Sequence, residues 1–318
     1  MLFRSVDDIW YVSWVHTRTG WGMEPRRIDA GVGGAYRWEA PLTDYAMLEQ
    51  LTYPTVTIDH QSTQDAVAFA QEVFQGRLRV VLGTSWWWSL GMTQDAVMLR
   101  GLEQMMMDMY DYPDAFHALM QHLSNGYLAL IDSLQAQGVL FPNTGNRYVG
   151  SGGFGFTNAL GDPEPGKVTT QHMWGFCESQ ETVQVSPAMF AEFIAPYQQP
   201  LLERFGLNCY GCCEPLNNRW HVVKHFPNLR RISVSAWADI PFMADALGGA
   251  YVFSWKPNPA DIAIAHPQWD RLTKNMQETL ARTRNCHVEV VMKDCHTLGV
   301  PENARKWVRM VREVIDGM

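Results

Sequence analysis

The chain has 318 residues, of which 47% are hydrophobic and 18% are charged, so it can bury a sizeable core as one large domain or two small ones. Its formal net charge of -8 argues against a nucleic-acid surface, because phosphate binding needs a basic face. No apolar run approaches the roughly 20 residues of a membrane span, and the start lacks the apolar stretch of a signal peptide. We therefore expect a cytoplasmic protein without nucleic-acid or membrane partners.

Short β-rich runs alternate with longer amphipathic stretches after the first fifty residues. This alternation is typical of βα units around a parallel sheet. The predicted strands are 9–15, 54–59, 78–84, 138–143, 172–179, 208–213, 230–237, 250–255 and 287–294, and the clearest predicted helices are 113–137, 187–204 and 301–316. The second helix opens with Ser186 and Pro187, a cap residue followed by proline at the first helical position.

Nine candidate strands for eight places favour an α/β fold of the (β/α)8 barrel type with one extra strand or insertion. The runner-up is a doubly wound open sheet, which lacks support because no G-x-G-x-x-G follows the first strands. Residues 144–170 hold seven glycines and are predicted to form a long ordered loop over the barrel mouth. We expect a single barrel domain over 36–318, preceded by an N-terminal segment, 1–35, of uncertain structure.

Function in a barrel collects at the C-terminal ends of the strands. Unusual residues follow five predicted strands, at 177–181, 212–214, 235–239, 256–259 and 293–296. Five such coincidences at successive strands favour a site over core packing.

The cysteines at the predicted 208–213 strand have more than one interpretation. Zinc takes thiolate, imidazole and carboxylate ligands, and Cys212, Cys213 and Glu214 could bind it together with Cys295 or His296. Because neighbours on a strand point to opposite faces, we expect only one of Cys212 and Cys213 to face the barrel axis. The alternatives are core packing, since cysteine is a small hydrophobe, and a redox pair. Six cysteines in a chain with a full core are expected to be reduced.

Other side chains also have two interpretations. Glu178 and Glu181 could transfer protons or simply be solvated or capping residues. His172, beside Trp174, could bind substrate or be a structural residue of its strand. The run of three tryptophans centred on Trp87 could line an apolar pocket for a flat ligand or pack at the barrel rim.

Several segments together resemble the uroporphyrinogen decarboxylase superfamily, and within it the proteins grouped with corrinoid-dependent methyltransferases. They are VLGTSWWWSLGMT (81–93), WGFCESQETVQVSPAMFAEFIAPYQQPLLERFG (174–206), YGCCEPL (210–216), ISVSAWAD (232–239), SWKPNPA (254–260) and VVMKDCHT (290–297). The resemblance covers the chain from about Tyr36 to the C-terminus and implies a (β/α)8 barrel with its site at the C-terminal mouth.

Departures from the family pattern narrow the function that the resemblance implies. The M-R-Q-A-G-R motif of the true decarboxylase is absent, so decarboxylation of uroporphyrinogen is not expected. In the zinc-dependent branch, which moves a methyl group from a corrinoid protein to a thiol, H-x-C and a later cysteine hold the metal. The resemblance carries over Cys212 or Cys213 and Cys295 as ligands, while Tyr210 or Gly211 stands in place of the histidine. Glu214 or His296 would have to complete the shell.

The resulting hypothesis is a corrinoid-linked methyltransferase with a zinc site at the barrel mouth and a corrinoid protein as partner. The expected catalytic residues are Glu178, Asp239 and Glu214, the expected substrate contacts are Trp174, Trp237, Lys256, Trp87 and His172, and the expected metal ligands are Cys212, Cys213, Cys295 and His296. The first alternative is a metal-free decarboxylase or lyase, with Lys256 and Arg147 clamping carboxylates. The second is a ligand-binding barrel without catalysis, and a homodimer is compatible with each.

Overall fold

A computed structural model describes residues 7–29, 36–293 and 300–318. Its centre is a parallel sheet of five strands that lie side by side in chain order. The strands are β9 (Trp174–Cys177), β10 (Leu207–Tyr210), β11 (Leu229–Val234), β12 (Val252–Trp255) and β13 (His287–Val290). Helices connect successive strands, as parallel pairing requires. The chain is therefore a mixed α/β protein.

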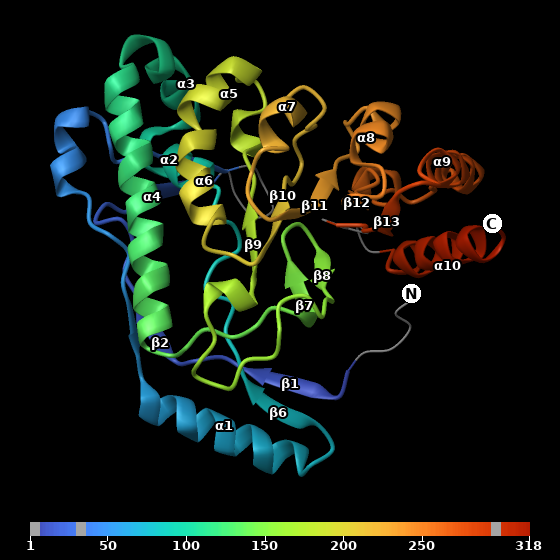
Figure 1. Cartoon of the computed structure of the whole chain (residues 1–318), viewed down its shortest axis with the longest axis horizontal. Helices are drawn as coiled ribbons and strands as arrows, with labels where there is room; N and C mark the ends of the chain where they lie inside the picture. Colours follow the sequence, from blue (N-terminus) through green and yellow to red (C-terminus); the bar gives the residue numbers. More distant parts are fainter. Residues whose placement is uncertain (1–6, 30–35, 294–299) are drawn as a thin grey trace.

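Helices flank this sheet on two sides (Figure 1). On one side lie α2 (Thr93–Arg100), α3 (Leu102–Asp111), α4 (Pro113–Ala136), α5 (Pro187–Phe193) and α6 (Ala195–Leu202). Near β11 to β13 lie α7 (Trp220–Val223), α8 (Ile240–Leu247), α9 (Trp269–Arg282) and α10 (Glu302–Asp316). The apolar face of α4, including Phe116, Leu123 and Leu130, is buried in the main core. Burial of such a stripe, rather than helix propensity alone, stabilises a helix of this kind.

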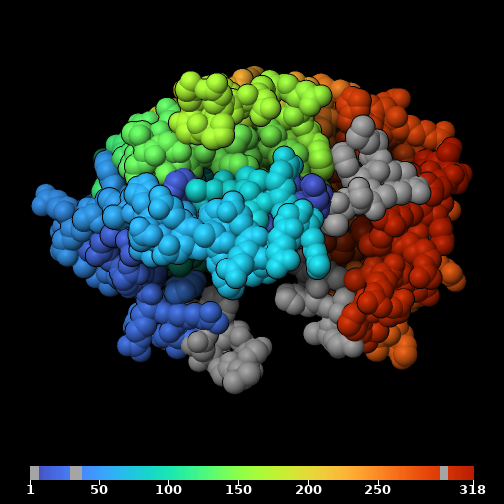
Figure 2. Space-filling model, turned by 90° about the horizontal axis from the view of Figure 1, so that it is seen from below, coloured from blue at the N-terminus to red at the C-terminus, as the bar shows by residue number. Residues whose placement is uncertain are grey.

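The N-terminal part contributes short paired strands. β1 (Ile9–Val12) pairs in parallel with β6 (Arg79–Leu82), and α1 (His60–Phe74) lies beside them at the bottom of Figure 1. β2 (His16–Arg18) pairs antiparallel with β5 (Val56–Ile58), and β3 (Arg26–Asp29) with β4 (Tyr36–Glu39). Figure 2 shows the face seen from below, which runs from the blue and cyan N-terminal third to the red C-terminal helices.

Most predicted strands are present, but three local expectations are wrong. Residues 138–143 form no strand; instead the Asn143 amide bonds both backbone groups of Trp174, at 2.9 and 2.8 Å, because Pro142 has no N–H for a ladder. The helix predicted at 187–204 is interrupted at Ile194, two residues before Pro196, which cannot donate the helical hydrogen bond.

The third difference lies in the segment 144–170, which is more than a loop. It contains an antiparallel hairpin of β7 (Gly145–Val149) and β8 (Gly153–Gly155). The structure also has four 3-10 turns within the described residues: η1 (Tyr45–Gln50), η2 (Thr170–His172), η3 (Gln180–Thr182) and η4 (Pro259–Asp261). The described strands form one five-stranded sheet and separate pairs, so closure into an eight-stranded barrel stays a prediction. No described helix combines the length and the apolarity that crossing a membrane demands.

Candidate functional site

One face of the parallel sheet carries a row of polar and charged side chains. Cys209 of β10 stands opposite Arg231 of β11, and Ser254 of β12 stands opposite Glu289 of β13. Ser254 is also in register with Ser233, two positions after Arg231, so the alternation of side chains puts the row on one face. Lys256 lies two positions beyond Ser254 and belongs to the same face. We call this the inner face.

Contacts join the members of this row. The Arg231 guanidinium forms an ion pair with Glu289, with Nε 2.9 Å from Oε1, and its Cζ lies 4.8 Å from the centre of the Trp174 ring. Ser254 Oγ donates to Glu289, and Lys256 Nζ donates to Ser254 Oγ and, at 3.1 Å, to the Ser254 carbonyl. Arg231 and Lys256 are both buried, at 5% and 2% exposure. The inner face is thus a connected charged network.

The β7–β8 hairpin covers this face. A Cβ on Gly153 would lie 2.7 Å from Glu289 Oε1, and one on Gly150 would lie 2.7 Å from Cys209 Sγ. Gly150 also has φ +65°, in the region that favours glycine. The glycine-rich turn between the two strands therefore permits close packing of the hairpin on the sheet, and Trp174 Nε1 donates to the Gly155 carbonyl at 3.0 Å.

Two cysteines meet a lysine beyond the end of β10, and we call this group the thiol corner. Lys293 Nζ lies 2.9 Å from Cys212 Sγ, 3.0 Å from Cys213 Sγ and 3.0 Å from Ser151 Oγ. The contact with Cys213 and burial raise the pKa of the Cys212 thiol, although the Lys293 ammonium opposes the shift. Through these contacts the segment after β13 meets the segment after β10. Ser151 joins the turn of the β7–β8 hairpin to the same group.

The expectation that only one of the adjacent cysteines faces inward rested on strand alternation, but both residues lie beyond the end of the strand. β10 ends at Tyr210, and Gly211 has φ +92°, so strand alternation no longer applies to the residues that follow. Cys212 is buried and Cys213 is exposed, yet both contact Lys293. The turn after the strand, not the strand itself, creates the pair.

The cysteine pair has dimensions that suit a metal. The two sulfurs lie 3.8 Å apart, and two thiolates on one tetrahedral zinc, each about 2.3 Å from it, lie about 3.8 Å apart. The Lys293 ammonium, within 3.0 Å of both sulfurs, marks a place that favours a cation. In the ranges that the structure describes, no group of three His, Cys, Asp or Glu forms a metal site. The predicted ligands Cys295 and His296 lie outside those ranges.

A second corner of buried charge lies beyond β9, and we call it the carboxylate corner. Glu214 Oε1 accepts from the Ser179 N–H and Oε2 from the Cys212 N–H, each at 2.9 Å. Arg219 donates to the carbonyls of Thr182 and Val185. Burial raises the pKa of Glu214, and the backbone N–H donors and Arg219 oppose it. Both oxygens of Glu214 are therefore occupied by backbone donors rather than turned toward the thiols.

Glu178 belongs to the same corner. It is 1% exposed, and its carboxyl accepts from Ser89 Oγ at 3.1 Å and from the Gln180 N–H at 2.9 Å. Burial, followed by the charges of Glu181 and Glu214, raises the pKa of Glu178 to about 8. At neutral pH this carboxyl holds a proton, which suits a general acid.

The remaining predicted residues lie apart from these corners. Asp239 caps α8 by accepting from the Phe242 N–H at 3.0 Å, and Trp237 is 70% exposed. His172 forms a capping box with Thr169 and precedes β9, at the strand end opposite Glu178. Trp87 packs edge to face on Phe205. Trp174 and Lys256 do meet the inner face, whereas Arg147 lies over the rings of Tyr11 and Phe141.

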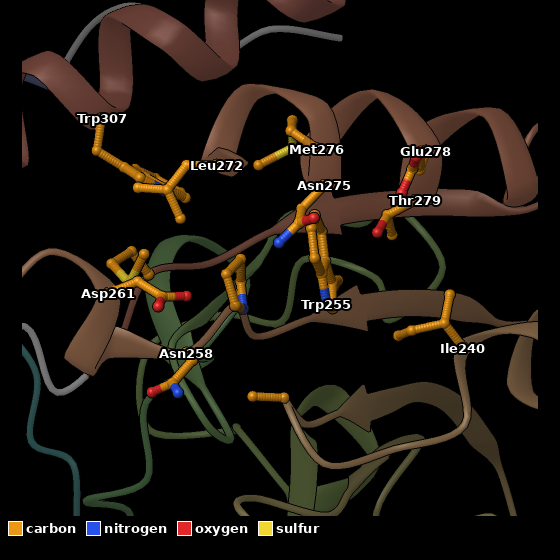
Figure 3. Close-up of a pocket in the computed structure, with 13 residues that line it drawn as sticks. Ile240, Trp255, Asn258, Asp261, Leu272, Asn275, Met276, Glu278, Thr279 and Trp307 are labelled. Atoms are coloured by element: carbon orange, nitrogen blue, oxygen red, sulfur yellow. The ribbon is translucent and has the colours of Figure 1, made fainter. Parts of the chain in front are cut away.

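A separate cavity of about 240 Å³ lies on the other side of β12 (Figure 3). Its walls come from the ends of β11 to β13 and from α8, α9 and α10, and they include Trp255, Trp307, Met276, Asn258 and Asp261. Trp255 alternates with Ser254 and Lys256 along the strand, so it faces away from the inner face. The cavity contains none of the residues predicted to be catalytic.

Sequence reasoning missed Arg231, Glu289 and Ser151, and named Lys293 only as part of a strand end. The positions of Arg231 on β11 and Glu289 on β13 could have indicated a charged face, but no local motif marked them. No protein-family model matches the chain, and no curated protein matches it either.

Proposed function

We propose that the protein is a corrinoid-linked methyltransferase that moves a methyl group between a corrinoid protein and a small thiol, with zinc bound at the thiol corner. The observation that carries this proposal is the 3.8 Å separation of Cys212 and Cys213 around one cationic group, at the ends of parallel strands. Thiols that stay reduced fit the cytoplasm, which we propose as its compartment.

Cys212 and Cys213 would hold the metal, with Cys295 as the third ligand that the family resemblance implies. Bound zinc would keep the acceptor sulfur deprotonated at neutral pH. Lys293 would then leave the sulfurs, because two cations repel each other at this range, and its ammonium would be available to the substrate.

The transfer itself is a displacement at carbon. The acceptor thiolate would take the methyl group from its corrinoid carrier, and the carrier would keep the electron pair of the bond that breaks. Apolar rings that exclude water would favour the reaction, since a dry site strengthens the attack of a charged sulfur. Phe176 and Trp174 of β9 supply such rings beside Cys209 and Cys212.

Glu178 would serve as the proton reservoir of the site. Its carboxyl is protonated at neutral pH because burial raises its pKa to about 8. It can therefore return a proton to a leaving thiolate when the reaction runs toward methylation of the corrinoid.

The first experiment measures bound metal by mass spectrometry on protein purified without chelator. We expect about one zinc per chain, lost in Cys212→Ser and Cys213→Ser. Cys286→Ser is the matched control, because this half-buried thiol bonds to the Ala244 carbonyl, away from the thiol corner. A metal-free native protein after zinc is supplied under reducing conditions would refute the zinc site.

The second experiment follows the absorption of free methylcobalamin with 2-mercaptoethanol as acceptor. We expect the spectrum of cob(I)alamin to appear with the native protein under anaerobic conditions and not with Cys213→Ser. Zinc binding without any turnover of methylcobalamin would leave a metal site but contradict methyl transfer.

A further inference from the structure

Among the residues that the structure describes, the inner face holds more cationic side chains than carboxylates. Arg231 and Lys256 are buried there, and Glu289 is the carboxylate that the described contacts give them. Lys293 contacts the two thiols instead. A buried charge without a counter-charge is costly, so either a proton leaves or an anion enters.

The position of Lys256 allows its ammonium group to lose a proton. Its Nζ donates to Ser254 Oγ, which in turn donates to Glu289 Oε1, so a chain of two hydrogen bonds leads from the amine to a carboxylate. A neutral amine can keep both of its contacts with Ser254 and still present a lone pair. This arrangement joins a nucleophile, a relay and an acceptor.

The groups around Lys256 set its charge state. Burial lowers the pKa of Lys256 to about 8; Cys209 and Glu289 oppose this, and the cations Arg231 and Lys293 reinforce it. Cys209 lies on β10, Arg231 on β11, Glu289 on β13 and Lys293 in the segment after β13. Both strands that flank β12 therefore contribute a charged group beside Lys256. Desolvation together with a nearby cation is a recognised way to activate a lysine.

The position of Arg231 allows it to bind an anion. Its Nη2 donates to the Phe154 carbonyl of the hairpin, but Nη1 has no acceptor among the described residues although it is buried. An unsatisfied donor of a buried guanidinium is rare, and a carboxylate is its usual partner. Arg231 lies on the same face as Lys256, one strand away.

We propose that Lys256 forms an imine with the carbonyl group of a small oxo acid whose carboxylate is bound by Arg231. The neutral Lys256 nitrogen attacks the carbonyl carbon and one of its protons passes to the carbonyl oxygen, which gives a carbinolamine. The hydroxyl group then leaves with the second nitrogen proton as water, while the nitrogen lone pair forms the new double bond of the imine. The reaction needs neither metal nor corrinoid, so it is an activity separate from methyl transfer.

Reductive trapping tests this proposal. The native protein is incubated with pyruvate and sodium cyanoborohydride in the presence of a chelator, and peptide mass mapping locates the reduced adduct. We expect Lys256 to be modified at least tenfold faster than the exposed Lys224, and Lys256→Met to lose the fast reaction. We also expect the rate to rise between pH 7 and pH 9, as the amine loses its proton.

A second probe tests the carboxylate without relying on a variant that could fail to fold. Acetone carries the same carbonyl group but no carboxylate, so we expect it to modify Lys256 at least tenfold more slowly than pyruvate. Modification of exposed lysines alone, or the same adduct yield in Lys256→Met, would overturn the imine. Equal rates with acetone and pyruvate would overturn the role of Arg231. A chelator does not affect any of these outcomes, so they are independent of the zinc site.

Discussion

The thiol corner and the carboxylate corner lie at the ends of neighbouring strands, yet their charged groups are used differently. In the carboxylate corner, Glu214 and Arg219 bond mainly to backbone groups, at Ser179, Cys212, Thr182 and Val185, and Arg219 also donates to the Thr182 hydroxyl at 3.2 Å. In the thiol corner, Lys293 contacts the side chains of Cys212, Cys213 and Ser151. Backbone partners fix a loop, whereas side-chain partners can be exchanged for a ligand. Glu214 and Arg219 therefore have an architectural role, whereas the thiol corner is the better candidate for chemistry, with Glu178 proposed as its proton reservoir.

Cysteine labelling gives the largest expected effect. Cys213 is exposed, while Cys177 and Cys209 are fully buried and burial raises the pKa of both thiols. We expect iodoacetamide to modify Cys213 at least about a thousandfold faster, because the buried pair reacts only after opening of the fold. Peptide mass mapping over time measures the rates. Comparable labelling rates of Cys213 and the buried cysteines in native protein would contradict the distinction between the thiol corner and the core. Unfolding in urea should abolish the difference in rate.

Arg219→Met tests the architectural role of Arg219 in the carboxylate corner. The substitution removes the donors of the buried Thr182 and Val185 carbonyls, so we expect the free energy of unfolding to fall by about 3 kcal/mol. Arg282→Met is the matched control, since its ion pair with Asp245 is exposed and should contribute less than about 1 kcal/mol. Urea denaturation measures both. Equal losses in the two variants would contradict the role given to Arg219.

Gly150→Ala tests how closely the hairpin covers the inner face. The new Cβ would lie 2.7 Å from Cys209 Sγ and 2.9 Å from the Phe176 ring, so we expect a loss of about 2 kcal/mol. Gly145→Ala is the control in the same hairpin: it has a similar φ, +76°, but open space around the Cβ, and should lose only about 1 kcal/mol. Unfolding curves that fail to separate the two variants would mean that the hairpin can move aside.

The smallest expected effect concerns Glu178 and pH. The pKa of its carboxyl is raised to about 8 in the folded protein from an ordinary 4.5, so between these values the folded state binds more protons than the unfolded state. The free energy of unfolding therefore falls as pH rises through this window. Glu178→Gln removes this loss, and we expect its advantage over the native protein to grow by about 1 kcal/mol from pH 7 to pH 8.

Thermal unfolding at several pH values measures this difference. Glu313→Gln, on the exposed side of α10, provides the control and should show no such trend. A pH-independent difference between Glu178→Gln and the native protein would show that Glu178 is charged in both states.

The sequence alone predicted the five strands of the parallel sheet, but not their boundaries or the short strands β2, β3, β4, β7 and β8. Short β-rich runs identified the strands around Trp174, Ile232 and Phe253, although β11 and β12 also carry polar residues of the inner face. Proline explains the main misses: Pro142 prevented a ladder and Pro196 interrupted a helix, although their apolar pattern suited both. The hairpin within 144–170 was missed because its glycines are also typical of loops.

The candidate site, too, could be predicted from the sequence only in part. The run YGCCEP, with its cysteines at a strand end, could be recognised from the sequence. Only the tertiary structure paired Cys212 and Cys213 with Lys293, some 80 residues later, and placed Arg231, Ser254 and Glu289 in one row. Local spacing determines which face of a strand a side chain occupies. Its neighbours depend on strand order and register, which form only when the sheet assembles.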